Sequence, residues 1–118
     1  MSFDPRCFLN LSYQLSDDIT YDEESKYRTS ISRAYYAAFL ISRTYLESED
    51  FTLSSTRSVH QEIIEYMKDV NYLVSNLLIK LRKNRTDADY NLTMLVKKGI
   101  TNSSIRCAQQ IIDEVNNM

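Results

Sequence analysis

Residues 27–45 read YRTSISRAYYAAFLISRTY, and this stretch decides the fold. Its apolar and aromatic side chains recur at steps of three and four residues, the period that places them on one face of an α-helix. They are Tyr27, Ile31, Ala34, Tyr35, Ala38, Ile41 and Tyr45. The alanines in the stretch are small enough for a second helix to approach closely. Thr20 and Glu23 have the spacing of a capping box, so we expect one long helix over residues 20–48.

Helical periodicity extends on both sides of this segment. We expect helices over residues 5–16, from Ser55 or Thr56 to residue 70, over residues 71–84 and over residues 102–116. Residues 92–98 allow a further helical turn or two beyond these five helices, which Gly99 would end. Residues 71–84 are broadly apolar, which predicts a central position. Because helices joined by short loops pack as antiparallel neighbours, the sequence predicts an all-α fold, an antiparallel up-and-down four-helix bundle with a fifth short helix.

The composition supports this class and excludes others. The chain has one glycine and one proline among 118 residues, whereas the turns of an all-β fold need many of both. A single glycine also excludes the glycine-rich phosphate loops of Walker and Rossmann sites. A chain of this length suits one core, so we expect a single domain over residues 1–118.

The net charge of -2 argues against general, charge-driven binding to nucleic acid. Cationic side chains nevertheless cluster locally at Lys80, Arg82, Lys83 and Arg85. Two cysteines and one histidine are too few for the usual four-ligand zinc site, and we expect no metal and no other cofactor. The sequence has no signal peptide and no apolar stretch long enough to cross a bilayer, which favours a cytoplasmic protein without membrane contact.

Residues 81–90 read LRKNRTDADY and contain the strongest candidate for a binding site. Arg82 and Arg85 are three apart and therefore neighbours on one helical face, with Asp89 and Tyr90 close enough to orient them. Paired guanidinium groups suit the recognition of phosphate or carboxylate. The alternative is a structural ion pair, in which an aspartate of this segment neutralises an arginine. The residue chemistry leaves both interpretations open.

The single histidine and the many tyrosines are the other side chains able to do chemistry. His60 is the only side chain with an ordinary pKa near neutrality, although a lone histidine at a helix start more often caps or packs. Nine tyrosines accompany no tryptophan. Tyrosines such as Tyr35 and Tyr36 suit an interface between subunits, and the same rings can stack on a nucleic-acid base. We expect Tyr35 and Tyr36 at a dimer interface.

Three features together resemble the HEPN family of prokaryotic domains. They are SRAYYAAF at residues 32–39, the later His60, and LRxxRxxADY at residues 81–90. The resemblance spans nearly the whole chain. It implies a compact up-and-down helical bundle that is usually a homodimer, with the polar motif facing its twin across a cleft. Many members are similar to metal-independent ribonucleases of toxin–antitoxin, phage-defence and CRISPR systems. Some pair with a minimal nucleotidyltransferase as antitoxin, and others bind nucleotides, RNA or protein partners.

The chain departs from the family's catalytic pattern, in which an arginine and a polar residue are followed by a histidine. Here Arg85 is followed by Asp89 and by Tyr90, where the histidine would stand. Imidazole transfers protons near neutral pH, whereas a phenol with a pKa near 10 is a poor substitute. This departure favours a non-catalytic member.

Three functional hypotheses follow. The first is a homodimer that binds the phosphate of a nucleotide or RNA, or a partner protein such as a cognate nucleotidyltransferase, in a defence or toxin–antitoxin module. In it Arg82 and Arg85 bind phosphate, Asp89 holds one guanidinium, and Tyr90 stacks or donates a hydrogen bond. The second is a ribonuclease toxin that uses Arg85, Asp89, Tyr90 and the more remote His60. The third is a purely structural dimerisation domain.

Overall fold

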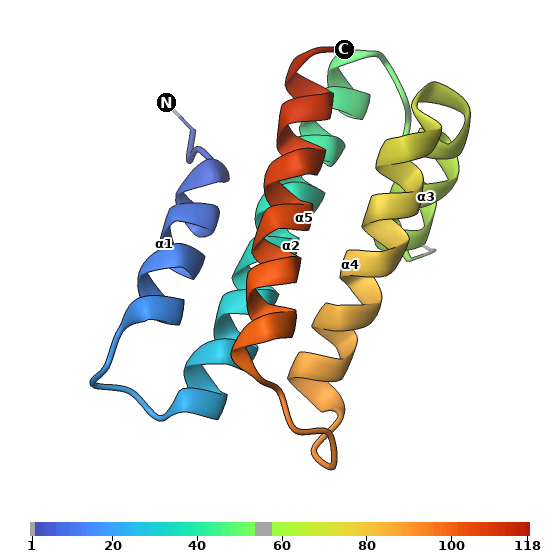
Figure 1. Ribbon diagram of the computed structural model, residues 1–118. Helices are drawn as coiled ribbons and strands as arrows, with labels where there is room; N and C mark the ends of the chain where they lie inside the picture. Colours follow the sequence, from blue (N-terminus) through green and yellow to red (C-terminus); the bar gives the residue numbers. More distant parts are fainter. Residues whose placement is uncertain (1, 54–57) are drawn as a thin grey trace.

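The structure is a computed structural model that describes residues 2–53 and 58–118. Within these residues the chain forms five helices and no strand (Figure 1): α1 (Arg6–Asp17), α2 (Glu23–Ser48), α3 (Val59–Val70), α4 (Tyr72–Tyr90) and α5 (Lys98–Asn116). Helices α1, α2, α4 and α5 alternate in direction, and the shorter α3 forms a hairpin with α4. The predicted all-α bundle of four helices and a fifth short one is confirmed.

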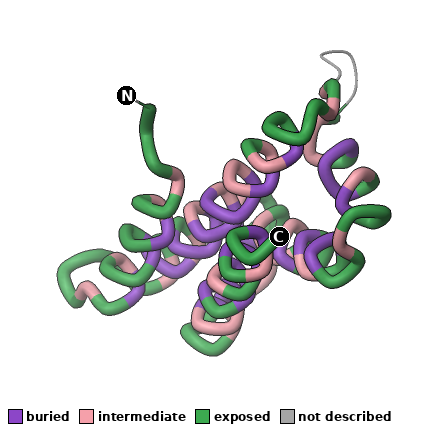
Figure 2. Tube along the Cα trace, turned by 90° about the horizontal axis from the view of Figure 1, so that it is seen from above, coloured by how far each residue is buried: buried purple, intermediate pink, exposed green. Residues whose placement is uncertain are grey.

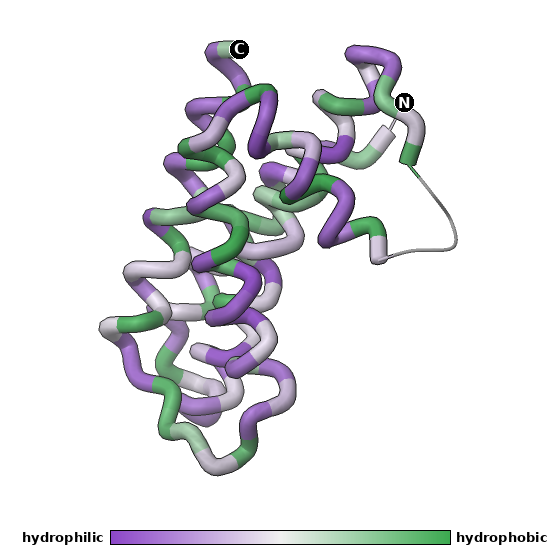
Figure 3. The backbone as a smooth tube through the Cα atoms, turned by 90° about the vertical axis from the view of Figure 1, so that its right-hand side faces the viewer, coloured by the Kyte–Doolittle hydropathy of each residue, from purple (hydrophilic) through white to green (hydrophobic). Residues whose placement is uncertain are grey.

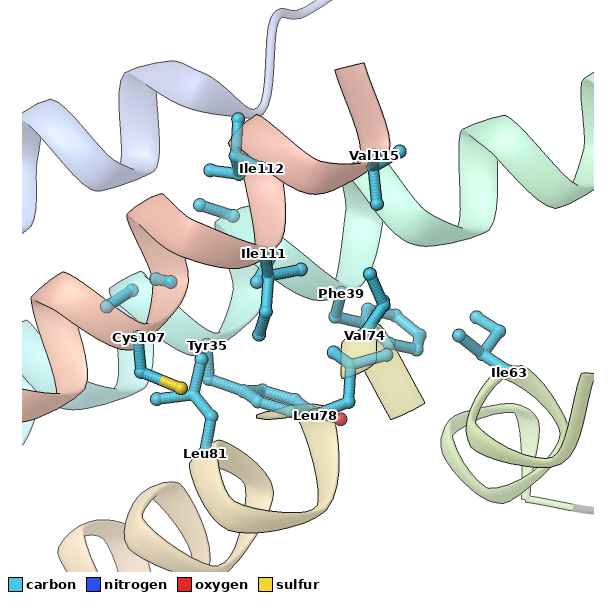
Figure 4. Close-up of a cluster of buried hydrophobic side chains, with 14 of the residues drawn as sticks. Tyr35, Phe39, Ile63, Val74, Leu78, Leu81, Cys107, Ile111, Ile112 and Val115 are labelled. Carbon is cyan, nitrogen blue, oxygen red and sulfur yellow. The ribbon is translucent and has the colours of Figure 1, made fainter. Parts of the chain in front are cut away.

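Helix α2 is the central element, because it contacts each of the other four helices. The stripe predicted from its sequence is buried: Ile31, Ala34 and Ala38 are 0% exposed. Seen from above in Figure 2, the buried residues of neighbouring helices face one another. The main core lies where α2, α4 and α5 meet, and the close-up in Figure 4 shows Tyr35, Phe39, Leu78, Leu81 and Ile111 among its side chains.

The helix starts differ from those expected. The N-cap of α2 is Asp22, whose carboxylate accepts a hydrogen bond from the Ser25 N–H at 3.0 Å. The predicted capping box at Thr20 is therefore wrong; Thr20 instead donates its N–H to Asp18 Oδ1 at 2.7 Å, within the preceding turn. The predicted start of the third helix at Ser55 or Thr56 lies outside the described residues, in which α3 begins at Val59.

The segment in which the sequence allows a further helical turn or two, residues 92–98, is irregular instead. Its leucines Leu92 and Leu95 are 85% and 64% exposed, so they provide no buried face that would stabilise a helix. Gly99 does not end a helix, because α5 already begins at Lys98 and includes it. The start of α5 lies four residues before the expected Asn102 because Thr101 is fully buried and bonds the Lys97 carbonyl at 3.1 Å.

Helix α4 extends to Tyr90, beyond the expected end at residue 84, and Arg28 of α2 explains the extension. The last carbonyl groups of a helix lack partners within it and carry partial negative charge. The Arg28 guanidinium donates to several of them and is held by Glu24 at 3.0 Å. Its acceptors are the carbonyl oxygens of Asp87 (3.3 Å), Ala88 (2.9 Å), Asn91 (3.1 Å) and Met94 (2.5 Å). Arg28 thus joins the first turns of α2 to the end of α4.

Hydrophobic side chains are also exposed at the end of the bundle where α4 finishes. Tyr90, Leu92 and Leu95 are 69%, 85% and 64% exposed, and we call these three residues the apolar end patch. The loop that contains the two leucines forms the bottom of the molecule in Figure 3. Within residues 2–53 and 58–118, none of the helices has the length and hydrophobicity needed to cross a membrane.

Asn71 ends α3 and caps α4, so its substitution tests how much one junction contributes. Its N–H donates to the Met67 carbonyl at 2.7 Å, and its side-chain oxygen accepts from the Val74 N–H at 3.2 Å. Because loss of an N-cap costs about 1 kcal/mol, we expect Asn71→Ala to lower the free energy of unfolding by about 1 kcal/mol. Urea denaturation measures this. The control Asn76→Ala, at an exposed position of α4, should change stability by less than about 0.5 kcal/mol. Equal stabilities of the two variants would contradict the prediction.

Candidate functional site

Side chains from α2, α3 and α4 gather around His60 and Tyr36 on one side of the bundle. Helix α2 contributes Arg33 and Arg43, and α4 contributes Arg82 and Arg85; we call these four residues the arginine cluster. The ring of Tyr36 is close to two of them, with the Cζ atoms of Arg33 and Arg85 at 4.8 and 5.2 Å from its centroid. The other two act electrostatically on His60. The helix packing therefore concentrates positive charge here, although the whole chain is slightly acidic.

Arg85 is held rigidly. Its Nη2 donates to the Tyr36 hydroxyl at 2.9 Å, and its Nε lies 2.9 Å from Asp89 Oδ2. The second contact is an ion pair in which the buried Nε–H is not directed at the carboxylate. Asp89 also accepts from the Ser32 hydroxyl at 3.2 Å. The structure thus places Asp89 where it holds one guanidinium. The exposed ring of Tyr90 lies 5.7 Å from the Arg85 Cζ.

Arg82 faces a different neighbour. Its Nη1 donates to Gln61 Oε1 at 3.3 Å, and its Nη2 lies 3.5 Å from the Ser58 hydroxyl. Both contacts are long for hydrogen bonds, and both partners are neutral. Among the described residues, no carboxylate lies within ion-pair distance of Arg82. The sequence predicts the two arginines as neighbours on one face, but their guanidinium groups have different partners. Arg85 is braced against α2 by Tyr36, whereas Arg82 reaches towards α3 and has no acidic partner among the described residues.

His60 lies between these elements, a position that the sequence did not indicate. Its imidazole stacks on Phe39 with centroids 4.1 Å apart, and its Nδ1 is 2.6 Å from the Tyr35 hydroxyl oxygen. Burial lowers the pKa of His60 to about 4, with further lowering by the guanidinium groups of Arg82, Arg85 and Arg43. The imidazole is therefore neutral at pH 7.

The two tyrosines expected at a dimer interface differ in their surroundings. Tyr35 is 1% exposed, so its side chain packs inside the protomer and has no surface to offer a partner. Burial also raises the pKa of the Tyr35 hydroxyl above its ordinary value, which keeps the proton on the phenol. Tyr36 is half-buried and holds Arg85. The interface prediction therefore rests on Tyr36.

Sequence reasoning missed Arg33 and Arg43. Arg33 stands three residues before Tyr36 in the stretch quoted above, and a spacing of three on a helix indicates contact. That signal was available. Arg43 could not be recognised in the same way, since its effect on His60 depends on how α3 packs against α2. Among the residues that the structure describes, no three His, Cys, Asp or Glu side chains form a cluster suited to a metal ion.

The lowered pKa of His60 predicts a pH dependence of stability. The unfolded chain takes up a proton near the ordinary value of 6.5, whereas the folded protein takes it up near 4. Because the unfolded state then binds more protons between these values, the free energy of unfolding should fall as the pH falls from about 6.5 to about 4. Denaturation of wild type and His60→Gln at several pH values measures this. The variant should lose that part of the slope, and identical slopes would contradict the assignment.

Comparison with known proteins identifies a family. The family model of the HEPN domain matches residues 19–118, the part of the chain that contains α2 to α5 and every residue of the site. No curated protein and no solved structure matches the chain significantly.

Proposed function

The chain belongs to the HEPN domain family, and from this premise we propose that it is a non-catalytic homodimer that binds the phosphate group of a nucleotide or RNA. The observation that carries the proposal is Arg82, a guanidinium without a carboxylate partner among the described residues, next to the braced Arg85 and the neutral His60. A guanidinium fork is well suited to phosphate oxygens because it donates two parallel hydrogen bonds.

The charge balance of the site supports an anionic ligand. The arginine cluster carries four positive charges, of which two are paired: Arg85 with Asp89 at 2.9 Å and Arg43 with Glu47 at 3.7 Å. Arg33 and Arg82 have no acidic partner in residues 2–53 and 58–118. A local excess of positive charge raises the concentration of anions at the surface. The exposed ring of Tyr90 beside Arg85 offers a face on which a base can stack.

The proposal of a homodimer rests on the family and on the apolar end patch. Tyr90, Leu92 and Leu95 are exposed, and Tyr90 also lies against Arg85 of the site; exposed apolar surface is typical of interaction sites. Light scattering at micromolar concentration tests the state directly, since the monomer mass of 13.8 kDa would contradict it.

Family membership also supports a biological setting. We place the protein in the cytoplasm, in a defence or toxin–antitoxin module whose second member is a cognate nucleotidyltransferase or another defence protein. The genes that neighbour this one test that setting, because such modules are encoded together.

Calorimetry tests the binding function. Nucleotides and short single-stranded RNAs are titrated into the protein, and saturable heat is expected that weakens as salt is added, as phosphate contacts require. The absence of heat at high protein concentration, with the dimer intact by light scattering, would contradict the proposal. Binding of a nucleoside that equals binding of its nucleotide would contradict the role of the arginines.

A second candidate function, a metal-independent ribonuclease, is favoured by one observation. His60 lies near Arg82 and Arg85. It brings an imidazole to the site, whereas α4 has Tyr90 at the position where catalytic members have a histidine. The test incubates end-labelled RNA with wild type and with Arg82→Ala/Arg85→Ala in the presence of EDTA. We expect no cleavage by either protein. Cleavage by the wild type alone would replace the binding proposal with a ribonuclease that uses Arg85, Asp89, Tyr90 and His60.

A further inference from the structure

The two nitrogen atoms of the His60 imidazole have different surroundings. Nδ1 lies 2.6 Å from the Tyr35 hydroxyl oxygen. Nε2 has no hydrogen-bond partner among the described residues. Since the imidazole is neutral, one nitrogen carries a hydrogen and the other a lone pair. Which nitrogen carries the hydrogen decides what His60 does to a ligand.

The position of Tyr35 determines the tautomer. Its side chain is 1% exposed and lies among core residues such as Val74 and Leu78 (Figure 4). Nδ1 is the only hydrogen-bond partner of its hydroxyl in the described part of the chain. A buried hydroxyl whose hydrogen has no acceptor is strongly disfavoured, so the O–H donates to Nδ1. The hydrogen of the imidazole is then on Nε2.

We propose that His60 donates its Nε2–H to a phosphate oxygen of the ligand, and that Tyr35 is the positioning residue that fixes this tautomer. The inference rests on the proposed function and names its ligand group more closely. Arg82, Arg85 and His60 then present only donors, so the site recognises an oxyanion. The site can bind either a terminal phosphate or a phosphodiester, because both have phosphate oxygens that accept hydrogen bonds.

This tautomer has a consequence for RNA chemistry. Removal of a proton from a 2′-hydroxyl needs a lone pair on the nitrogen that faces the substrate. Nε2–H has none, and Nδ1 is occupied by Tyr35. The same hydrogen bond that makes His60 a phosphate donor therefore prevents it from acting as a general base, and an RNA phosphodiester is held without being cut. The low pKa of His60 agrees with a neutral donor beside arginines.

Nitrogen NMR tests the tautomer without any ligand. The chain contains one histidine, so protein labelled with ¹⁵N-histidine gives the two imidazole signals of His60 alone. At pH 7 the spectrum should show the neutral form protonated at Nε2. Tyr35→Phe, which removes only the hydroxyl, should give a mixture of both tautomers, and a thermal melt confirms that this variant folds. A wild-type imidazole protonated at Nδ1, or charged, would overturn the inference.

Titration with inorganic phosphate tests the donor role. We expect the Nε2 signal to move as phosphate saturates the site, and His60→Phe to weaken phosphate binding about tenfold, since a hydrogen bond to a charged group is lost. His60→Gln, whose amide N–H can replace the donor, should keep most of the affinity. If calorimetry shows binding while the Nε2 signal stays in place, His60 is not a donor and the inference fails alone. If neither phosphate nor RNA binds, the proposed function fails and the donor role with it, whatever tautomer is found.

Discussion

The Arg82→Ala/Arg85→Ala variant is expected to bind inorganic phosphate and nucleotides about a thousandfold more weakly than the wild type. Each charge-assisted hydrogen bond contributes about 1.5–3 kcal/mol, and loss of two such contacts amounts to about 4 kcal/mol, or about three factors of ten in affinity. Calorimetry at constant salt concentration measures the change.

The matched control is Lys80→Ala/Lys83→Ala, which also removes two positive charges from α4, but at exposed positions. It should weaken binding only slightly, because Lys83 is already paired with Asp87 at 3.0 Å and neither lysine belongs to the arginine cluster. Equal losses in both double variants would show that net charge alone attracts the ligand, and would contradict a defined site.

The single variants separate binding from folding. Arg82→Ala should lose affinity without loss of stability, since Arg82 has only long contacts with two neutral side chains. Arg85→Ala also leaves Asp89 and Tyr36 without their partner, so it should lower stability as well as affinity. A purely structural role for the two arginines predicts the opposite: destabilisation or loss of the dimer, with unchanged ligand binding.

Arg28→Ala is expected to lower the free energy of unfolding by about 3 kcal/mol. The change removes a guanidinium whose side chain is 17% exposed and leaves the carbonyl groups at the end of α4 without their donor. Arg28→Lys should recover little of the loss, because one ammonium cannot reach acceptors that a planar fork bridges. Urea denaturation followed by circular dichroism measures both.

Arg106→Ala is the control for Arg28, since Arg106 is an exposed arginine of α5. It should change stability by less than about 0.5 kcal/mol. Because Asp89 and Tyr90 lie in the turn that Arg28 holds, Arg28→Ala should also weaken phosphate binding, although Arg28 lies outside the arginine cluster. Wild-type stability of Arg28→Ala would show that water replaces its hydrogen bonds without cost.

The features predicted correctly from the sequence are those set by near neighbours in the chain. The burial of Ile31, Ala34 and Ala38 follows from the helical period of their own segment, which can be recognised within about twenty residues of sequence. The expectation that Asp89 holds one guanidinium likewise follows from spacing, although only the structure identifies its partner as Arg85, four residues before it. Both could be stated before any tertiary structure was known.

The errors have two physical causes. At the start of α2, Thr20 and Asp22 both have side chains able to cap a helix, and the turn made by Asp18 decides between them. At the end of α4, the helix continues to Tyr90 because Arg28, 60 residues away in the sequence, donates hydrogen bonds to its last carbonyl groups. Local pattern contains no information about such a partner.

For the same reason, only the part of the candidate site that lies within α4 could be predicted from the sequence. Asp89 and Tyr90 were assigned from spacing. The direction of Arg82 and the place of His60 depend on how α3 packs against α2 and α4, which no spacing reveals. The Tyr35 hydroxyl is the clearest case: its residue was expected at a dimer interface, whereas its side chain is buried and bonds His60 within the protomer.

Helix α1 contacts α2 and α5 but neither α3 nor α4, and it lies before the residues that the family model matches. Native proteins open in cooperative units of unequal stability, and α3 likewise contacts only two helices, α2 and α4. Detachment of α1 leaves the contacts of Arg82, Arg85 and His60 intact and costs the site only the stacking of Phe8 on Arg33. Opening of α1 would therefore preserve the binding surface, whereas opening of α3 would remove His60 from it.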